Sequence, residues 1–202
     1  MPRDAEAVRE IKIGYAFKEW AVIVDALGRG EQSLILRKGG IQEASRAFRV
    51  DHDQFFLFPT FEHQNEEDLA AKASSRLEKI QSGVTQGASD IPIQFYAVLE
   101  DWIRVEHLGP LRAIKRFHAW SERAVEKRFQ WGGKPGLYAL VVRVFKLAAV
   151  FQLKPKNSYA GCKSWVSLEE DIPTRGSVPV LAPDRFEAVK SSIGRILQTK
   201  TS

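Results

Sequence analysis

The sequence predicts a mixed α+β fold for this chain of 202 residues. Apolar residues recur at helical spacing in some segments, whereas other segments are short β-branched or aromatic runs bounded by glycine or proline. A length near 200 residues fits one large domain or two small ones. We therefore expect two halves, 1–100 and 101–202, which form either separate domains or one continuous domain.

The first half is predicted to follow an αβββαβ-like order. Val8, Ile11 and Tyr15 recur near helical spacing and predict an N-terminal helix. The β-branched run beginning at Ala21 predicts a strand, and Gly28 suits a turn into the next strand. The expected elements are a helix over 5–20, strands over 21–27, 33–37 and 55–58, a helix over 66–80 capped by Asn65, and a strand over 93–99 that continues as a helix over 100–105.

The second half is predicted to be a basic α+β unit. Ser121 is a favourable N-cap for the helix that follows it. The glycine-rich segment 132–136 ends that helix, because glycine and proline interrupt regular structure. The expected elements are helices over 111–117 and 122–129, strands over 137–147, 164–168 and 178–181, and an amphipathic helix over 184–197.

Positive charge is concentrated in the second half. Residues 1–100 hold 12 Lys and Arg against 16 Asp and Glu, whereas residues 101–202 hold 18 against 9. From Arg104 to Lys163 there are 13 basic and only 3 acidic side chains, and tryptophans lie among them. Basic groups neutralise phosphates and flat rings stack on bases, so this combination predicts binding of DNA or RNA.

The residues that we expect to contact nucleic acid are Arg37, Arg116, His118, Trp120, Arg128, Trp131, Arg143, Lys163 and Trp165. A second interpretation explains the same pattern without a ligand. The tryptophans would then be core residues, the basic groups would form a solvated surface, and the chain would be a non-catalytic interaction or structural protein.

A polar group in the first half raises the hypothesis of a nuclease-like phosphodiesterase site, active or inactive. The predicted αβββαβ order matches the core of PD-(D/E)xK nucleases, in which carboxylates hold Mg²⁺ or Mn²⁺ and a lysine orients the nucleophile. Glu19 and Glu62 are the candidate metal ligands, and Lys38 and Gln64 complete the candidate catalytic set.

Two features of the sequence limit this hypothesis. The strand predicted over 33–37 contains no aspartate, which such nucleases place there, and Asp25 on the previous predicted strand is a poor substitute. The order of strands before the acidic segment at Glu66 also resembles a Nudix hydrolase. That helix lacks the clustered carboxylates of the Nudix motif, so the alternative is a degenerate, nucleotide-binding Nudix-like domain.

The sequence predicts a cytoplasmic location. Its longest apolar runs, 137–142 and 147–151, are far shorter than the ~20 residues of a membrane-spanning helix. The start of the chain lacks the charged-then-apolar order of a signal peptide. A single cysteine, Cys162, excludes an internal disulfide and fits a reducing compartment.

Several separated motifs resemble a bacterial family catalogued as domain of unknown function 1802, and they occur in that family's order along nearly the whole chain. They are Lys18-Glu19-Trp20-Ala21-Val22, Leu36-Arg37-Lys38-Gly39-Gly40-Ile41, Phe58-Pro59-Thr60-x-Glu62-His63-Gln64, His118-x-Trp120 and Tyr159-x-Gly161-Cys162-x-Ser164-Trp165. The resemblance implies a bacterial protein of about this length without an assigned activity. It also implies a remote relationship to restriction-endonuclease-like folds.

Overall fold

A computed structural model describes residues 11–38, 52–61, 64–83, 90–161 and 163–198. The strands are β1 Tyr15–Trp20, β2 Leu34–Arg37, β3 Gln54–Thr60, β4 Ile91–Val105, β5 Leu137–Leu153, β6 Trp165–Ser167 and β7 Val178–Pro179. The helices are α1 Ala21–Gly28, α2 Ala71–Gly83, α3 Leu108–Ala113, α4 Glu122–Gln130 and α5 Pro183–Gln198. Short 3-10 turns lie at η1 Glu66–Asp68, η2 Lys115–Phe117, η3 Trp131–Gly133 and η4 Asn157–Tyr159. The mixed α+β class is confirmed.

The described strands form one mixed sheet in the order β2-β5-β4-β3-β1-β6, with β7 paired to β5. The β1–β3 pair is parallel, and the other pairs are antiparallel. The sheet curls so that its two ends come together. Arg37 at the end of β2 donates a hydrogen bond to Ser164 Oγ, just before β6. The backbone N–H of Lys18 in β1 also donates to the Ser164 carbonyl, over 2.9 Å. The two edges of the sheet order therefore meet.

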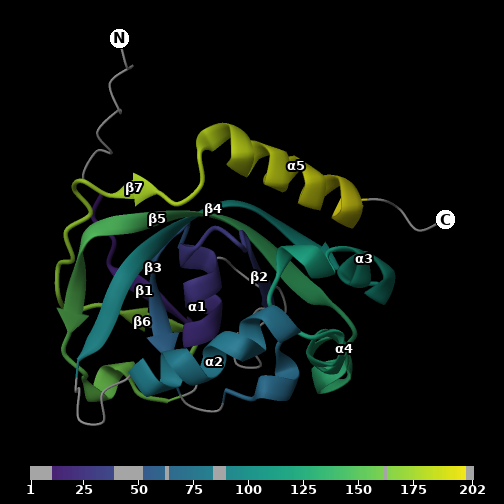
Figure 1. Ribbon diagram of the computed structural model, residues 1–202, viewed down its shortest axis with the longest axis horizontal. Helices are drawn as coiled ribbons and strands as arrows, with labels where there is room; N and C mark the ends of the chain where they lie inside the picture. Colours follow the sequence, from purple (N-terminus) through teal and green to yellow (C-terminus); the bar gives the residue numbers. More distant parts are fainter. Residues whose placement is uncertain (1–10, 39–51, 62–63, 84–89, 162, 199–202) are drawn as a thin grey trace.

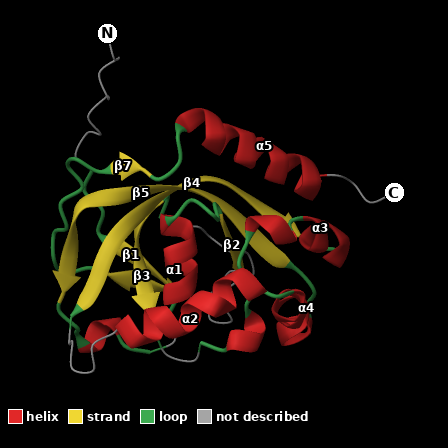
Figure 2. Ribbon diagram, in the orientation of Figure 1, coloured by secondary structure: helices red, strands yellow, loops and turns green. Residues whose placement is uncertain are grey.

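Helices cover this curved sheet on two sides (Figures 1 and 2). Helix α1 lies within the curve, and α2 crosses its lower end in the view of Figure 1. Helix α5 runs across the outer side of β4 and β5, where Phe186 is only 1% exposed and packs beneath the Arg143 guanidinium. Because helices cover them, the long strands β4 and β5 can be apolar over most of their length.

Two adjacent predictions in the first half are wrong. Residues 15–20 form strand β1 instead of the end of a helix, and residues 21–28 form helix α1 instead of a strand. Helix α1 buries six of its eight residues, and Asp25 is its one charged side chain, so its amphipathic period is weak. A short, mostly apolar run of this kind cannot be distinguished from a buried strand by periodicity. The predicted β-hairpin and the αβββαβ order are therefore absent from the described residues.

Two further predictions need smaller corrections. The predicted helix over 66–80 begins as the 3-10 turn η1, capped as expected by Asn65, and continues as α2 after a break at Leu69. The segment 100–105, expected to be helical, continues strand β4 past a β-bulge near Glu100. None of the described helices combines the length and the apolar character needed to cross a membrane.

Candidate nucleic-acid interface

A buried carboxylate lies at the junction of β1 and α1. Glu19 is 4% exposed, and its Oε1 accepts a hydrogen bond of 2.9 Å from the backbone N–H of Trp20. Its other oxygen lies 3.8 Å from Arg37 Nη1 of β2. The hydroxyl of Thr60 donates to the Glu19 carbonyl over 3.1 Å. The end of β1 therefore directs one acid into the molecule and places a cation beside it.

A second arginine approaches from α4. The Arg128 guanidinium carbon lies 3.4 Å from the centre of the Trp120 ring and 5.8 Å from that of Trp20. Burial lowers the pKa of Arg128 from its usual value; Glu19 and Asp68 act in the opposite direction, and Arg37 adds to the lowering. We call Glu19, Arg37, Arg128, Trp20 and Trp120 the Glu19 centre.

Polar atoms around the Glu19 centre have no hydrogen-bond partner among the described residues. They are Glu19 Oε2, Gln64 Nε2, Asp68 Oδ1, His118 Nε2 and Trp120 Nε1. Buried polar groups are normally paired with protein or with ordered water. The set contains both donors and acceptors. The charges of Glu19 and Arg37 offset each other across this centre.

Six of the residues singled out by sequence meet here, namely Glu19, Arg37, Gln64, His118, Trp120 and Arg128. They do not make a nuclease site. Lys38 turns away and donates to the carbonyls of Phe129, Lys134 and Gly136. Glu62 lies outside the described residues.

The nuclease hypothesis is therefore wrong. Across the part of the chain that the structure describes, no three His, Cys, Asp or Glu side chains gather as metal ligands could. The helix expected to carry Glu19 is strand β1, so the element order on which the hypothesis depended is not observed. The Nudix-like alternative fails for a related reason, since its first predicted strand is helix α1. The expected Mg²⁺ or Mn²⁺ has no described ligand set.

Glu19→Gln is expected to lower the free energy of unfolding by about 2 kcal/mol, because it removes the negative charge that faces two partly buried arginines. Urea unfolding at pH 7 measures the change. The matched control is Glu126→Gln. Glu126 pairs with exposed Arg112 on the surface, so a loss of roughly 0.5 kcal/mol or less is expected. Equal losses in the two variants would contradict the assigned role of Glu19.

A second feature lies at the adjoining end of β4 and β5, and we call it the Trp102–Trp131 surface. We define it as exposed Trp102 and Arg104 on β4, the buried ring of Tyr138 on β5 beside them, and the turn before β5 that carries exposed Trp131 and Lys134. Trp102 is 47% exposed and Trp131 is 58% exposed. The rings of Trp102 and Tyr138 have centres 5.9 Å apart, and the Arg104 guanidinium lies 5.6 Å from the Tyr138 ring.

The turn that carries Trp131 adjoins this cluster. It is closed by a hydrogen bond from the N–H of Gly136 to the Phe129 carbonyl, and the Lys38 ammonium donates to three carbonyls within it. A Cβ placed on Gly136 would lie 3.6 Å from Arg104 Nη2, so the turn ends beside Arg104. Burial and the Arg104 charge both lower the pKa of Lys38.

Carboxylates, most of them in the second half itself, pair with many of its basic side chains. The ion pairs are Arg104–Glu106, Arg112–Glu126, Lys115–Glu122, Arg123–Glu67, Arg143–Glu100, Arg143–Glu187, Lys154–Asp90 and Lys156–Glu169. Among the described residues, neither Lys127 nor Lys134 has a carboxylate partner. Both lie within four residues of exposed Trp131 in the sequence.

The remaining sequence candidates lie apart from this surface. Arg143 is held between Glu100 and Glu187, as a half-buried charge requires. Trp165 packs edge-on against Phe17 and Phe55 as a core ring. Arg116 is exposed and covers the Phe117 ring, and Lys163 is exposed beside the Ser158 carbonyl.

Sequence reasoning missed Trp102, Arg104, Lys134 and Tyr138 as members of the candidate interface. Residues 100–105 were expected to form a helix, in which positions 102 and 104 point in different directions. In strand β4 these two residues share one face, because side chains alternate with a period of two. The alternation of Trp102, Ile103 and Arg104 was the available signal.

The fold and these sites define an α+β domain with a curled mixed sheet and an exposed basic–aromatic surface. The model of the family described as domain of unknown function DUF1802 matches residues 16–192, so the chain belongs to that family. No curated protein shows detectable similarity to the chain.

Solved structures of similar shape include the crystal structure of ASCH from Zymomonas mobilis, which is 11% identical at a TM-score of 0.44. That match covers 88% of this chain and 93% of the other. A mutant of the same protein matches with 12% identity and a TM-score of 0.45, over 88% of this chain and 96% of the other.

Proposed function

We propose that the chain binds single-stranded DNA or RNA through the Trp102–Trp131 surface. The observation that carries this proposal is the exposure of two tryptophans, 47% and 58%, in a protein whose other large rings are mostly packed. Exposed apolar surface rimmed by polar residues is typical of interaction sites, and bases are suitable partners for indoles because every base presents a π-face.

The charges around the two rings support a nucleic-acid partner. Lys127 and Lys134 are exposed cations within four residues of Trp131 in the sequence, and Arg104, which pairs with Glu106, shares a strand face with Trp102. Phosphates along a strand would meet these cations while adjacent bases stack on the indoles. A single strand fits better than a duplex, since the faces of paired bases are already stacked on one another.

The proposal predicts salt-dependent binding. Fluorescence anisotropy with labelled 12-nucleotide single strands of RNA and DNA should show affinity falling as ionic strength rises, with a slope of about −0.7 per phosphate contact. Lys134→Ala should weaken binding and reduce the size of that slope by about 0.7.

The control is Arg185→Ala, which removes an exposed cation at the start of α5. This variant should bind as the unaltered protein does. An absence of binding to both strands at low salt would refute the proposal. An equal effect of the two substitutions would show that only net charge matters and would remove Lys134 from the interface.

A further inference from the structure

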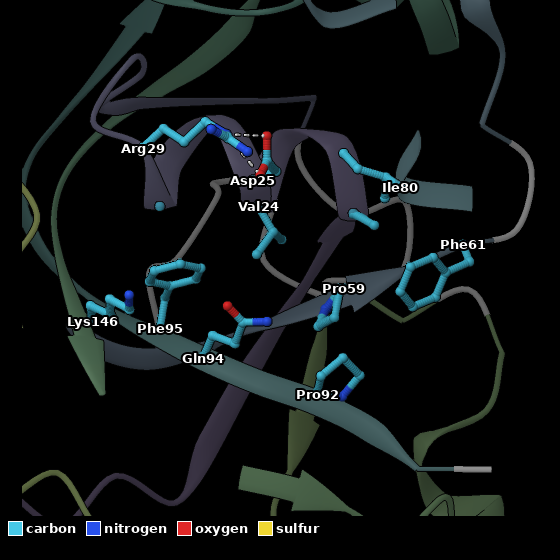
Figure 3. Close-up of a pocket in the computed structure, with 12 residues that line it drawn as sticks. Val24, Asp25, Arg29, Pro59, Phe61, Ile80, Pro92, Gln94, Phe95 and Lys146 are labelled. Carbon is cyan, nitrogen blue, oxygen red and sulfur yellow. Dashed lines mark hydrogen bonds and ion pairs between the residues drawn. The ribbon is translucent and has the colours of Figure 1, made fainter. Parts of the chain in front are cut away.

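A cavity of about 350 Å³ lies between helix α1 and the strands β3 and β4 (Figure 3). Its lining combines apolar and polar side chains, and the apolar ones come from elements far apart in the sequence. They include Val24, Pro59, Phe61, Ile80, Pro92 and Phe95. This volume is at the lower end of the range for small-molecule sites, so it fits a compact ligand.

A close contact at one end gives the cavity its shape. The Phe95 ring lies directly against the backbone of Gly28, where a Cβ would come within 2.2 Å of a ring atom. Only glycine permits this approach, so the end of α1 and the ring of β4 are fitted to each other. The Phe95 ring therefore closes one end of the cavity.

Three kinds of polar group line the same space. The Gln94 amide projects from β4 toward α1 and has no hydrogen-bond partner among the described residues (Figure 3). Lys146 of β5 lies beside Phe95 and is exposed, and it has no carboxylate partner in the described part of the chain. Asp25 is occupied, because it accepts two hydrogen bonds of 2.9 and 3.0 Å from Arg29 Nε.

We propose that this cavity binds one nucleotide, with the base between the apolar walls, its edge on the Gln94 amide and its phosphate on Lys146. A primary amide both donates and accepts, which matches the edge of a nucleobase. An aliphatic ligand would leave the Gln94 amide without a partner, at a cost in affinity. An anion without a ring would leave the apolar walls unfilled.

The nucleotide could be free in solution or an unpaired residue of a bound strand, and in the second case the inference depends on the proposed function. Titration calorimetry with the four nucleoside 5′-monophosphates tests the free form, and anisotropy with the 12-nucleotide strands tests the other. Gln94→Leu replaces the amide by an apolar group, and Lys146→Gln removes the cation. Each should weaken binding of the preferred monophosphate about tenfold.

Arg185→Gln is the matched control for Lys146→Gln and should leave monophosphate binding unchanged. Circular dichroism establishes that the variants are folded. The inference is overturned if no monophosphate binds and Gln94→Leu also leaves strand binding unaltered. In that case, strand binding by the unaltered protein would still support the proposed function. Monophosphate binding that Gln94→Leu does not weaken would also overturn it. Monophosphate binding without strand binding would support the cavity and remove the proposed function.

Discussion

Replacing Trp102 and Trp131 together by alanine is expected to weaken binding of single-stranded nucleic acid by at least about thirtyfold. Stacking of one base on an aromatic side chain contributes roughly 1–3 kcal/mol, and the double variant removes two such rings. A loss of about 2 kcal/mol corresponds to roughly thirtyfold in Kd. Both side chains are largely exposed, so the substitutions should leave the fold intact.

The control for this variant is Val178→Ala, which trims another exposed apolar side chain, 56% accessible, on β7. It should change neither affinity nor salt dependence. In the double tryptophan variant the affinity should fall while the slope of affinity against salt stays the same, because no cation has been removed. An unchanged Kd in the double variant would show that strands bind elsewhere or not at all.

Protein stability is expected to fall by about 3 kcal/mol between pH 6.5 and pH 4 because of His118. Burial lowers the pKa of His118 from 6.5 to about 4, and the positive charge of Arg128 contributes in the same direction. Above pH 6.5 the imidazole is neutral in both folded and unfolded chains, and its full contribution is present. As the pH falls through this window the unfolded chain takes up the proton first, so the folded state loses stability.

The surroundings of His118 explain why protonation is unfavourable. The ring is 7% exposed, and its Nδ1 accepts a hydrogen bond of 3.3 Å from the Trp120 backbone N–H. Arg128 lies nearby. The ring also faces a small cavity whose charged lining is Arg112, Lys115, Glu122 and Glu126, and these four are already paired with one another.

Urea unfolding at a series of pH values measures the effect. His118→Gln cannot titrate, so the stability gap between this variant and the unaltered protein should narrow as the pH falls from 6.5 to 4. His107→Gln removes an exposed imidazole and should retain the pH profile of the unaltered protein. A constant gap for His118→Gln would contradict a buried, neutral His118.

The amphipathic segments were predicted well from sequence because their burial is one-sided. Helix α4 begins after the Ser121 cap, as expected, and α5 spans nearly the predicted residues. The incorrect prediction of a helix before Trp20 and a strand after it has a different cause. Residues 21–28 are mostly buried, so their local pattern carries only a weak period, and pairing of 15–20 with β3 and β6 overrides helical spacing.

The candidate site was predicted in part. Glu19, Arg37, Trp120 and Arg128 converge in the structure, whereas the sequence places Glu19 in a nuclease site and the other three in a nucleic-acid interface. Their meeting depends on the approach of α4 to the start of α1, which no local pattern encodes. Trp102 was left out because its segment was assigned to a helix.

The sequence by itself determined the α+β class, the breaks at glycine and proline, and the excess of positive charge in the second half. Only the tertiary structure decided which of those charges remain unpaired and which tryptophans are exposed. Arg123, Arg143 and Lys154 pair with Glu67, Glu187 and Asp90, which are 44 to 64 residues away in the sequence. Charge pairing and ring burial both depend on contacts between distant segments, and those contacts exist only once the sheet has curled.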